Sequence, residues 1–279
     1  MEQLAKKMKM SVTTTSDSSC NLEQRCKNKC DRYNKQEGSL HLEDGYNCDK
    51  CKNKGFIAIP IKTDFGYWTE AMKPCECQTA RRNLMHLKNS GLENIVKKYT
   101  FANYKIDQAW QSNIKNKALS FIKKENGGWF FIGGSSGAGK THICTAICSH
   151  YLDQGQEVRY MMWREDIERL KANKMDAEVY AEMMDKFKTV PVLYIDDLFK
   201  TGKADMLQKP TPADINTAFE LLNYRYNKPD LITIISSESQ IADLINIDEA
   251  IAGRIKERCG DYLINIKPDK TKNYRLRNT

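Results

Sequence analysis

The chain has 279 residues, of which 41% are hydrophobic, enough for one packed domain and a smaller module. No apolar stretch reaches the length of a membrane span, and the first residues lack the apolar segment of a signal peptide. We therefore expect a cytoplasmic protein without a membrane partner. Ten cysteines without a secretory signal favour metal ligands over disulfides.

The net charge of +8 is concentrated in two stretches of the chain. Residues 48–100 carry ten lysines and arginines against five acidic residues, and the last thirteen residues carry five against one. This distribution suits an anionic partner, and nucleic acid is the first candidate. A solvated surface without a partner is the alternative interpretation.

Composition changes along the chain divide it into four segments. Residues 1–44 are polar and weakly periodic, so we expect one or two short helices and otherwise disorder. A compact cysteine module follows at 45–80 and a helical linker at 81–100. The remainder, 101–279, is long enough for a full domain.

The cysteine module contains two closely spaced pairs of cysteines, separated by 23 residues: Cys48 and Cys51, then Cys75 and Cys77. Four thiolates in two such pairs match a closed tetrahedral Zn²⁺ site. A module of this size buries too little apolar surface to fold alone, so a structural zinc ion would stabilise it. Further candidate ligands lie upstream, namely Cys20, Cys26, Cys30 and His41, and a second metal site that uses these three cysteines remains open.

Lysines and aromatic residues are mixed in the same module, as in Lys62, Phe65, Tyr67, Trp68 and Lys73. This mixture suits single-stranded DNA, because bases stack on rings and phosphates contact lysines. It suits a protein interface equally well.

Beyond residue 100, predicted strands alternate with predicted helices. The strands are expected at 129–132, 157–162, 191–195, 231–236 and 261–266. The longest helices are expected at 141–153, 164–186 and 212–226, and shorter ones at 79–88, 92–98 and 110–125. Such alternation predicts an α/β fold with a mostly parallel sheet that helices cover on both faces.

A glycine-rich loop joins the first of these strands to the helix that follows it. The loop reads G-S-S-G-A-G-K-T, which matches the G-x-x-x-x-G-K-[ST] phosphate loop. In that motif, backbone N–H groups and the helix start converge on a polyphosphate. Lys140 would reach the β- and γ-phosphates, and the Thr141 hydroxyl would ligate Mg²⁺. The expected nucleotide-binding residues are Gly134, Ser135, Ser136, Gly137, Ala138, Gly139, Lys140 and Thr141.

A second motif is the apolar run 191–195, which ends in two acids, Asp196 and Asp197. We expect Asp196 to hold Mg²⁺ through water opposite Thr141, and Asp197 to orient or deprotonate the attacking water. The predicted strand at 157–162 separates the two motifs. This insertion favours the AAA+/RecA-like branch of P-loop proteins over small-molecule kinases.

Two further patterns bear on phosphate chemistry. The next predicted strand ends in Ser236, Ser237 and Glu238, where a polar residue would sense the γ-phosphate. Downstream, a predicted helix at 247–258 places Arg254 and Arg258 one turn apart. Such arginines would reach the phosphates of an adjacent subunit as an arginine finger in trans. Surface pairing with glutamates is the alternative interpretation.

With these motifs in this order, residues 45–279 resemble the DnaC/DnaI family of replicative helicase loaders, especially its phage-type members. The likeness rests on the GSSGAGKTH loop, YIDDLFK at 194–200, TIISSE at 233–238, the two-arginine helix and YRLR at 274–277. The cysteine module looks similar too. Carried over by position, the resemblance implies a catalytic centre of Lys140, Thr141, Asp196 and Asp197. It adds His142 to the nucleotide site, makes Arg258 the first candidate for the trans finger, and makes Arg277 a second sensor arginine.

The resemblance implies an AAA+ ATP hydrolase that uses ATP and Mg²⁺, assembles with copies of itself, and loads a hexameric helicase onto single-stranded DNA. The chain departs from the family pattern at two positions. Asp197 stands where Glu is more usual and is one methylene shorter, which suggests slow hydrolysis. Glu238 stands where many relatives have Asn, and its carboxylate would repel a γ-phosphate unless it is turned away or bound to metal. The alternatives are an IstB-type transposition helper, an ATP-switched nucleic-acid-binding module without turnover, and a small-molecule kinase.

Overall fold

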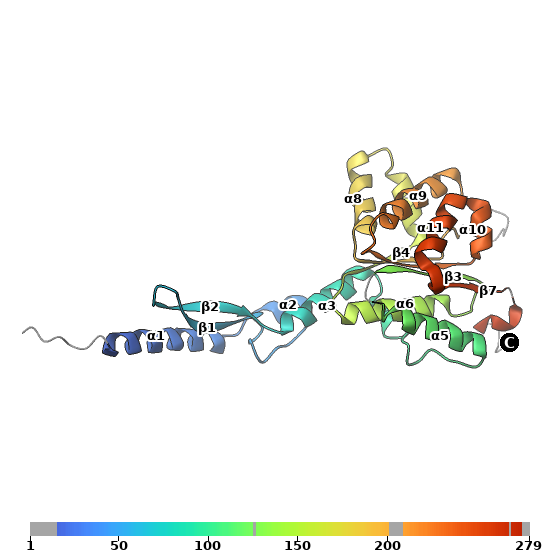
Figure 1. Cartoon of the computed structure of the whole chain (residues 1–279). Helices are drawn as coiled ribbons and strands as arrows, with labels where there is room; N and C mark the ends of the chain where they lie inside the picture. The colour runs from blue at the N-terminus through green and yellow to red at the C-terminus, as the bar shows by residue number, and fades with distance from the viewer. Residues whose placement is uncertain (1–15, 125–126, 201–208, 268, 275–279) are drawn as a thin grey trace, which may run out of the picture. The chain divides into compact units, whose positions relative to one another are not determined.

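The computed structural model describes residues 16–124, 127–200, 209–267 and 269–274 (Figure 1). The chain divides into two compact units, Met1–Arg81 and Arg82–Thr279. The helices are α1 (Ser16–Lys35), α2 (Leu40–Asp44), α3 (Cys77–Ser90), α4 (Glu93–Val96), α5 (Ala109–Phe121), α6 (Lys140–Asp153), α7 (Trp163–Ala172), α8 (Ala177–Lys188), α9 (Pro212–Tyr226), α10 (Ile241–Ile247) and α11 (Glu249–Cys259). The strands are β1 (Phe56–Lys62), β2 (Trp68–Pro74), β3 (Gly128–Gly134), β4 (Val158–Met162), β5 (Val192–Asp196), β6 (Ile232–Ser237) and β7 (Leu263–Ile266). None of the helices in the described ranges is long and apolar enough to cross a membrane.

The first unit is built on an antiparallel hairpin of β1 and β2, with helix α1 packed against it. Cys26 and Cys30 of α1 are buried together with Ala58 of β1. The side-chain amide of Asn34 donates to the carbonyl of Ala58 at 2.9 Å and accepts from its N–H at 2.9 Å, as a neighbouring strand would. Our expectation of one or two short helices in this region was wrong, because α1 has 20 residues. Its packed face contains cysteines and an asparagine in place of aliphatic residues, so the sequence showed little periodicity.

The second unit contains a five-stranded parallel sheet in the order β4-β5-β6-β3-β7. All five predicted strands are confirmed to within two residues at each end. Strand β6 lies between β3, which leads into the glycine-rich loop, and β5, which ends in the paired acids. The strand expected between the two motifs in sequence, β4, lies at the edge of the sheet.

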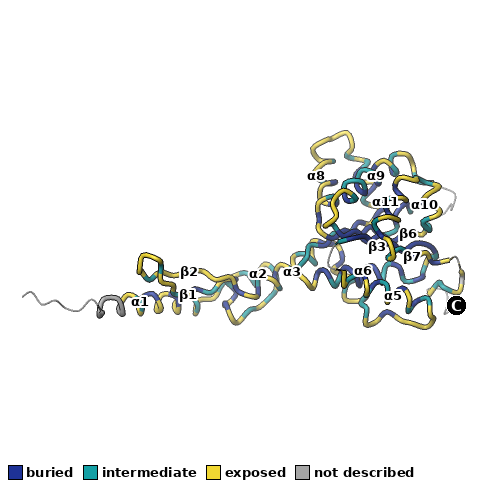
Figure 2. Tube along the Cα trace, viewed as in Figure 1, coloured by how far each residue is buried: buried dark blue, intermediate teal, exposed yellow. Residues whose placement is uncertain are grey.

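Helices cover both faces of this sheet, and Figure 2 shows the buried strands between them. Along β3, Trp129 and Phe131 enter the core formed with α7, α8, α9 and α11. Their neighbours Phe130 and Ile132 enter the opposite core, formed with α5 and α6. The alternation of side chains along a strand explains why a strand buried on both faces reads as a continuous apolar run. The predicted α/β fold class is therefore confirmed.

Two predicted helices differ from the observed ones. The helix expected at 164–186 is split into α7 and α8, and Asp176 caps the start of α8 by accepting from the N–H of Val179. The helix expected at 247–258 begins later, because Asp248 caps α11 through the N–H of Ile251 at 2.7 Å. In both places a short acidic side chain offers the backbone an N-cap that competes with a continuous helix.

Arg225 of α9 is fully buried and joins three elements of the second unit. Its guanidinium donates to the carbonyls of Phe187, Lys188 and Val190, which include the last carbonyls of α8. It also donates to Thr233 Oγ1 and to the carbonyl of Ile232, both in β6. Helix ends leave such carbonyls without intrahelical partners, and a cation there is favourable. Burial nevertheless lowers the pKa of Arg225 to about 9.

Candidate functional site

The glycine-rich loop runs from the end of β3 to the start of α6. Lys140 is buried, and its ammonium donates to the carbonyls of Gly134 at 2.8 Å and Ser135 at 2.9 Å. Gly134 has a φ of 111°, and a Cβ there would lie 2.0 Å from the carbonyl oxygen of Ile266, so only glycine fits. Burial lowers the pKa of Lys140, and the carboxylates of Asp197 and Glu238 oppose that shift. A strand, a glycine turn and a helix start thus meet as a phosphate-binding loop requires.

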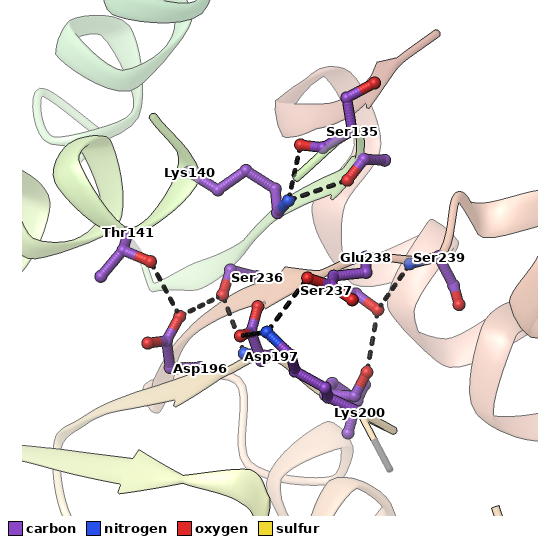
Figure 3. Close-up of polar contacts among 12 residues, drawn as sticks. Ser135, Lys140, Thr141, Asp196, Asp197, Lys200, Ser236, Ser237, Glu238 and Ser239 are labelled. Carbon is purple, nitrogen blue, oxygen red and sulfur yellow. Dashed lines mark hydrogen bonds and ion pairs between the residues drawn. The ribbon is translucent and has the colours of Figure 1, made fainter. Parts of the chain in front are cut away.

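Asp196, the last residue of β5, accepts hydrogen bonds from four hydroxyl groups, and Figure 3 shows those of Thr141 and Ser236. Its Oδ1 accepts from Thr141 at 3.3 Å, Tyr194 at 2.6 Å and Ser236 at 2.5 Å, and its Oδ2 accepts from Tyr160 at 2.7 Å. The two oxygens expected to face Mg²⁺, from Thr141 and Asp196, therefore lie together. A hydroxyl and a carboxylate are hard oxygen donors that fit this ion. Ser236 belongs to the segment expected to sense phosphate, but no motif pointed to Tyr160 or Tyr194, because both are ordinary strand residues.

Asp197 lies in a tight turn after β5 that holds its side chain beside the glycine-rich loop. Its backbone φ is 55°, and Phe199 in the same turn has a φ of 64°, both in the left-handed region that non-glycine residues seldom adopt. Leu198 and Phe199 are buried in the core, which anchors the turn. The N–H of Asp197 donates to Ser236 Oγ at 3.0 Å, and the N–H of Leu198 donates to the Ser236 carbonyl at 2.8 Å. Core packing and β6 together hold this unusual backbone conformation.

Lys200 ends the same turn and is a charged site residue to which the sequence motifs assigned no role. Its ammonium lies 2.8 Å from Asp197 Oδ2 and 3.0 Å from Glu238 Oε1 (Figure 3). Burial opposes its charge, but these two carboxylates raise the pKa of Lys200. The lysine thereby offsets the negative charge that Glu238 brings to a phosphate site. Ser237, expected to sense phosphate, is fully buried and donates to the Leu198 carbonyl at 2.8 Å, so it supports the turn instead of lining the cavity.

These groups border a cavity of about 520 Å³. A segment to which the sequence motifs assigned no role also lines the cavity. Its lining residues are Lys98, Tyr99, Asn103, Tyr104, Lys105, Trp110 and Gln111. Tyr104 is 6% exposed, and its hydroxyl has no hydrogen-bond partner within the described ranges. Burial raises the pKa of Tyr104 to about 12, so this hydroxyl stays neutral. In a nucleotide complex, a polar atom of the sugar or base would satisfy this buried hydroxyl.

His142, expected to contribute to the nucleotide site, also lines this cavity. Its ring lies against the rings of Tyr99 and Tyr104, with centroid distances of 5.0 and 5.1 Å. Its Nε2 lies 2.9 Å from the carbonyl oxygen of Thr100. Burial lowers the pKa of His142, which favours the neutral imidazole. His142 therefore joins the start of α6 to the aromatic wall.

The C-terminal segment lies against the glycine-rich loop. The Ser135 hydroxyl donates to the carbonyl of Lys267 at 3.2 Å, and the N–H of Tyr274 donates to the carbonyl of Gly137 at 3.0 Å. Lys272 and Tyr274 both line the cavity. Arg277, expected as a second sensor arginine, lies outside the described residues.

The two arginines of α11 do not line the cavity of their own chain. Arg254 donates to Asn223 Oδ1 at 3.1 Å, and its guanidinium lies over the Phe219 ring at 4.8 Å. Arg258 donates to the Pro229 carbonyl at 3.0 Å. Arg254 is thus held by a side-chain hydrogen bond and an aromatic ring, whereas the Arg258 guanidinium donates to a backbone carbonyl. A role for either arginine in an adjacent subunit stays a prediction.

The four cysteines predicted to bind zinc come together in the first unit, with all four sulfur atoms within 4.8 Å of one another. The N–H of Gly55 donates to Cys51 Sγ at 3.2 Å. Burial would raise the pKa of Cys51, but this N–H and the neighbouring thiols lower it to about 7. Four clustered sulfurs with an N–H donor to one of them have the chemistry of a closed tetrahedral zinc site, which could be formed by Cys48, Cys51, Cys75 and Cys77.

Arg81 supports this cysteine cluster, although no sequence motif pointed to this residue. Its guanidinium forms a buried ion pair with Asp44, donates to Asn53 Oδ1 at 3.1 Å, and hydrogen-bonds the Cys77 sulfur. A cation beside thiolates offsets their charge and orients them. Asn53 in turn accepts from the N–H of Cys48 at 2.8 Å.

The second metal site left open by the sequence is not formed by the residues that the structure describes. Within those ranges, the cluster above is the one group of three or more potential ligands close enough to share an ion. Cys26 and Cys30 instead pack against the hairpin, and burial raises the pKa of Cys30. The side chain of Cys20 lies outside the described residues.

A phosphate loop on a five-stranded parallel sheet, with an acid pair two strands away, defines a P-loop ATP-binding fold of the AAA+ class. Residues 75–278 match the family model of the IstB-like ATP binding proteins, and the chain belongs to that family.

Individual proteins and a solved structure are also similar to this chain. The uncharacterized protein YqaM of Bacillus subtilis strain 168 is 32% identical over 235 residues, which are 80% of this chain and 72% of that protein. The phage-like element PBSX protein XkdC of the same strain is 29% identical over 235 residues, which are 80% of this chain and 83% of that protein. A crystal structure of the DnaC helicase loader shares the fold, with a TM-score of 0.53 at 20% identity over 62% of this chain and 98% of that one.

Proposed function

We propose that this protein uses ATP to load a hexameric replicative helicase onto single-stranded DNA. The observation that carries the proposal is the cavity at which the phosphate loop, the Thr141–Asp196 pair and Asp197 meet. Membership of an ATP-binding family and the fold shared with the DnaC helicase loader support it. The basic stretch at 48–100 fits an anionic partner such as single-stranded DNA.

ATP hydrolysis in this site would be slow. Backbone N–H groups of the loop and Lys140 would hold the phosphates, and Thr141 with Asp196 would hold Mg²⁺, which neutralises charge on the β- and γ-phosphates when bound. Asp197 would orient the attacking water and accept its proton. Because the Lys200 ammonium lies 2.8 Å from Asp197 Oδ2, this carboxylate is already paired with a cation and is less available to the water. Slow turnover suits a protein that switches between two assemblies.

Assembly with copies of this chain would complete the site. Arg258 would reach the γ-phosphate bound by the neighbouring subunit, which agrees with its absence from the cavity of its own chain. Arg258→Ala is then expected to keep ATP binding and to lose ATP-dependent assembly and single-stranded DNA binding. Size-exclusion chromatography with light scattering and fluorescence anisotropy measure these properties. Unchanged assembly and hydrolysis in the variant would contradict the trans arrangement.

The first unit would dock on the helicase. Zinc held by the four cysteines would supply the covalent constraint that a two-stranded sheet and one long helix lack. Exposed aromatic side chains near the hairpin turn, Phe65 at 87% and Tyr67 at 70%, offer contact area for a partner.

Native mass spectrometry of this protein with the replicative helicase of its own host or phage tests the proposal. With ATP, we expect a helicase hexamer that carries several copies of this chain, and without ATP fewer copies. Absence of any complex, from a protein that still binds ATP and single-stranded DNA, would contradict helicase loading. Because the family model is that of IstB-like proteins, a transposase complex would then be the next candidate.

A further inference from the structure

Two carboxylates face the phosphate end of the cavity, and one lysine lies between them. Asp197 and Glu238 both line the cavity, and the Lys200 ammonium is 2.8 Å from the first and 3.0 Å from the second. An ammonium has three N–H donors, and the carboxylates use two. The third has no partner within the described ranges. Lys200 lines the same cavity as Lys140, on the side of the acids (Figure 3).

The position of Lys200 is fixed by the fold of the turn that carries it. Leu198 is 1% and Phe199 7% exposed, and the Phe199 ring packs edge-on against Trp163 at 5.4 Å. The N–H of Lys200 donates to the carbonyl of Asp197 at 2.9 Å, which closes the turn. The buried side chains of Leu198 and Phe199 therefore anchor the turn that holds Lys200 at the cavity. Such rigid support is what a ligand-binding side chain needs.

Two carboxylates without a counter-cation would repel a polyphosphate. A nearby cation is enough to offset the charge of these carboxylates. For that purpose the cation need not line the cavity, and it need not have an N–H donor left without a partner. Lys200 has both properties. Glu238 holds the ammonium from the β6 side and Asp197 from the β5 side, so the remaining donor is available for an anion.

We infer that Lys200 binds the terminal phosphate of a nucleoside triphosphate and that Glu238 positions it for this contact. The inference rests on the proposed ATP site and assigns to it a second lysine. The glycine-rich loop holds phosphates that ADP and ATP share, and Lys140 reaches the β-phosphate as well as the γ-phosphate. Lys200 instead lies with the acids expected at the γ-phosphate. Lys200 thereby makes the site favour the triphosphate over the diphosphate.

Calorimetric titration of the full chain with Mg²⁺–ADP and with the Mg²⁺ complex of the non-hydrolysable β,γ-methylene analogue of ATP tests this role. In Lys200→Met, affinity for the triphosphate analogue is expected to fall about tenfold, the effect of one charge-assisted hydrogen bond, and affinity for ADP to change little. Lys200→Arg should keep part of the preference. The matched control is Lys186→Met, since Lys186 pairs with Glu182 at 2.8 Å outside this cavity.

A double variant separates phosphate binding from charge neutralisation. Lys200→Met with Glu238→Gln removes one positive and one negative charge, so the net charge of the wall returns to that of the wild type. If Lys200 contacts the phosphate, the double variant still lacks the triphosphate preference. Recovery of the wild-type preference in the double variant would overturn the inference, and so would equal losses for both nucleotides in Lys200→Met. Failure of the wild-type protein to bind either nucleotide would instead contradict the proposed ATP site itself.

Discussion

Replacing Asp197 by asparagine isolates the charge that we assign to water activation. Asparagine has nearly the same shape and tolerates the left-handed φ of 55° at this position, so the turn should persist. A positioned general base contributes about 10²- to 10⁴-fold to a rate. Because the Asp197 side chain is 29% exposed and already paired with Lys200, the lower end applies. We expect kcat for ATP hydrolysis to fall about a hundredfold, which is about 2.7 kcal/mol on the barrier.

Phosphate release measures kcat, and titration with a non-hydrolysable ATP analogue measures affinity. The affinity should change less than about threefold, because the loop and Lys140 still hold the phosphates. Asp185→Asn, an exposed acid on α8 outside the ATP cavity, is the matched control and should leave both quantities unchanged. A kcat within about threefold of wild type in Asp197→Asn would refute the role of this carboxylate.

Three other perturbations test separate parts of the account. Arg225→Met leaves the carbonyls at the end of α8 unpaired, and we expect urea unfolding to show a loss of about 3–5 kcal/mol, whereas a loss below about 1 kcal/mol would contradict that role. Removing zinc with a chelator, or replacing Cys77 by serine, should lower the unfolding temperature of the first unit measured by circular dichroism and leave ATP affinity unchanged. An unchanged unfolding temperature would argue against a structural metal. Tyr104→Phe should weaken ATP and ADP equally by about fivefold in calorimetry, because the hydroxyl is assigned to the nucleoside, and no change would remove it from the site.

Local patterns allowed most of the second unit to be predicted. The run 129–132 and the glycine-rich loop specify a buried strand, a turn and a helix start within one short stretch of sequence. The helix predicted at 212–226 likewise has the observed bounds of α9, whose start has a capping box at Thr211 and Pro212 at the first helical position. Such signals depend on neighbours in sequence, which is why they can be read without a structure.

The parts that could not be predicted depend on residues distant in sequence. Lys200 and Glu238 are 38 positions apart and meet because β5 and β6 are adjacent in the sheet. Tyr104 belongs to a segment without a sequence motif. It becomes a candidate site residue only in the folded structure, where its ring lies next to Gly139 of the loop. Helix α1 was underestimated because Asn34 and two cysteines make its contacts with the hairpin, and these are not residues that predict a buried helical face.

The most direct test of the central claim is a loading assay on circular single-stranded DNA, which a closed helicase ring cannot thread by itself. The helicase of the same host or phage is incubated with the circle, ATP and this protein, and helicase that co-elutes with the DNA is measured. We expect this protein to increase DNA-bound helicase, and the Lys140→Ala variant to lose the ATP-dependent part of that increase. Equal amounts of DNA-bound helicase with and without this protein, in a mixture where it binds ATP, would contradict its assignment as a helicase loader.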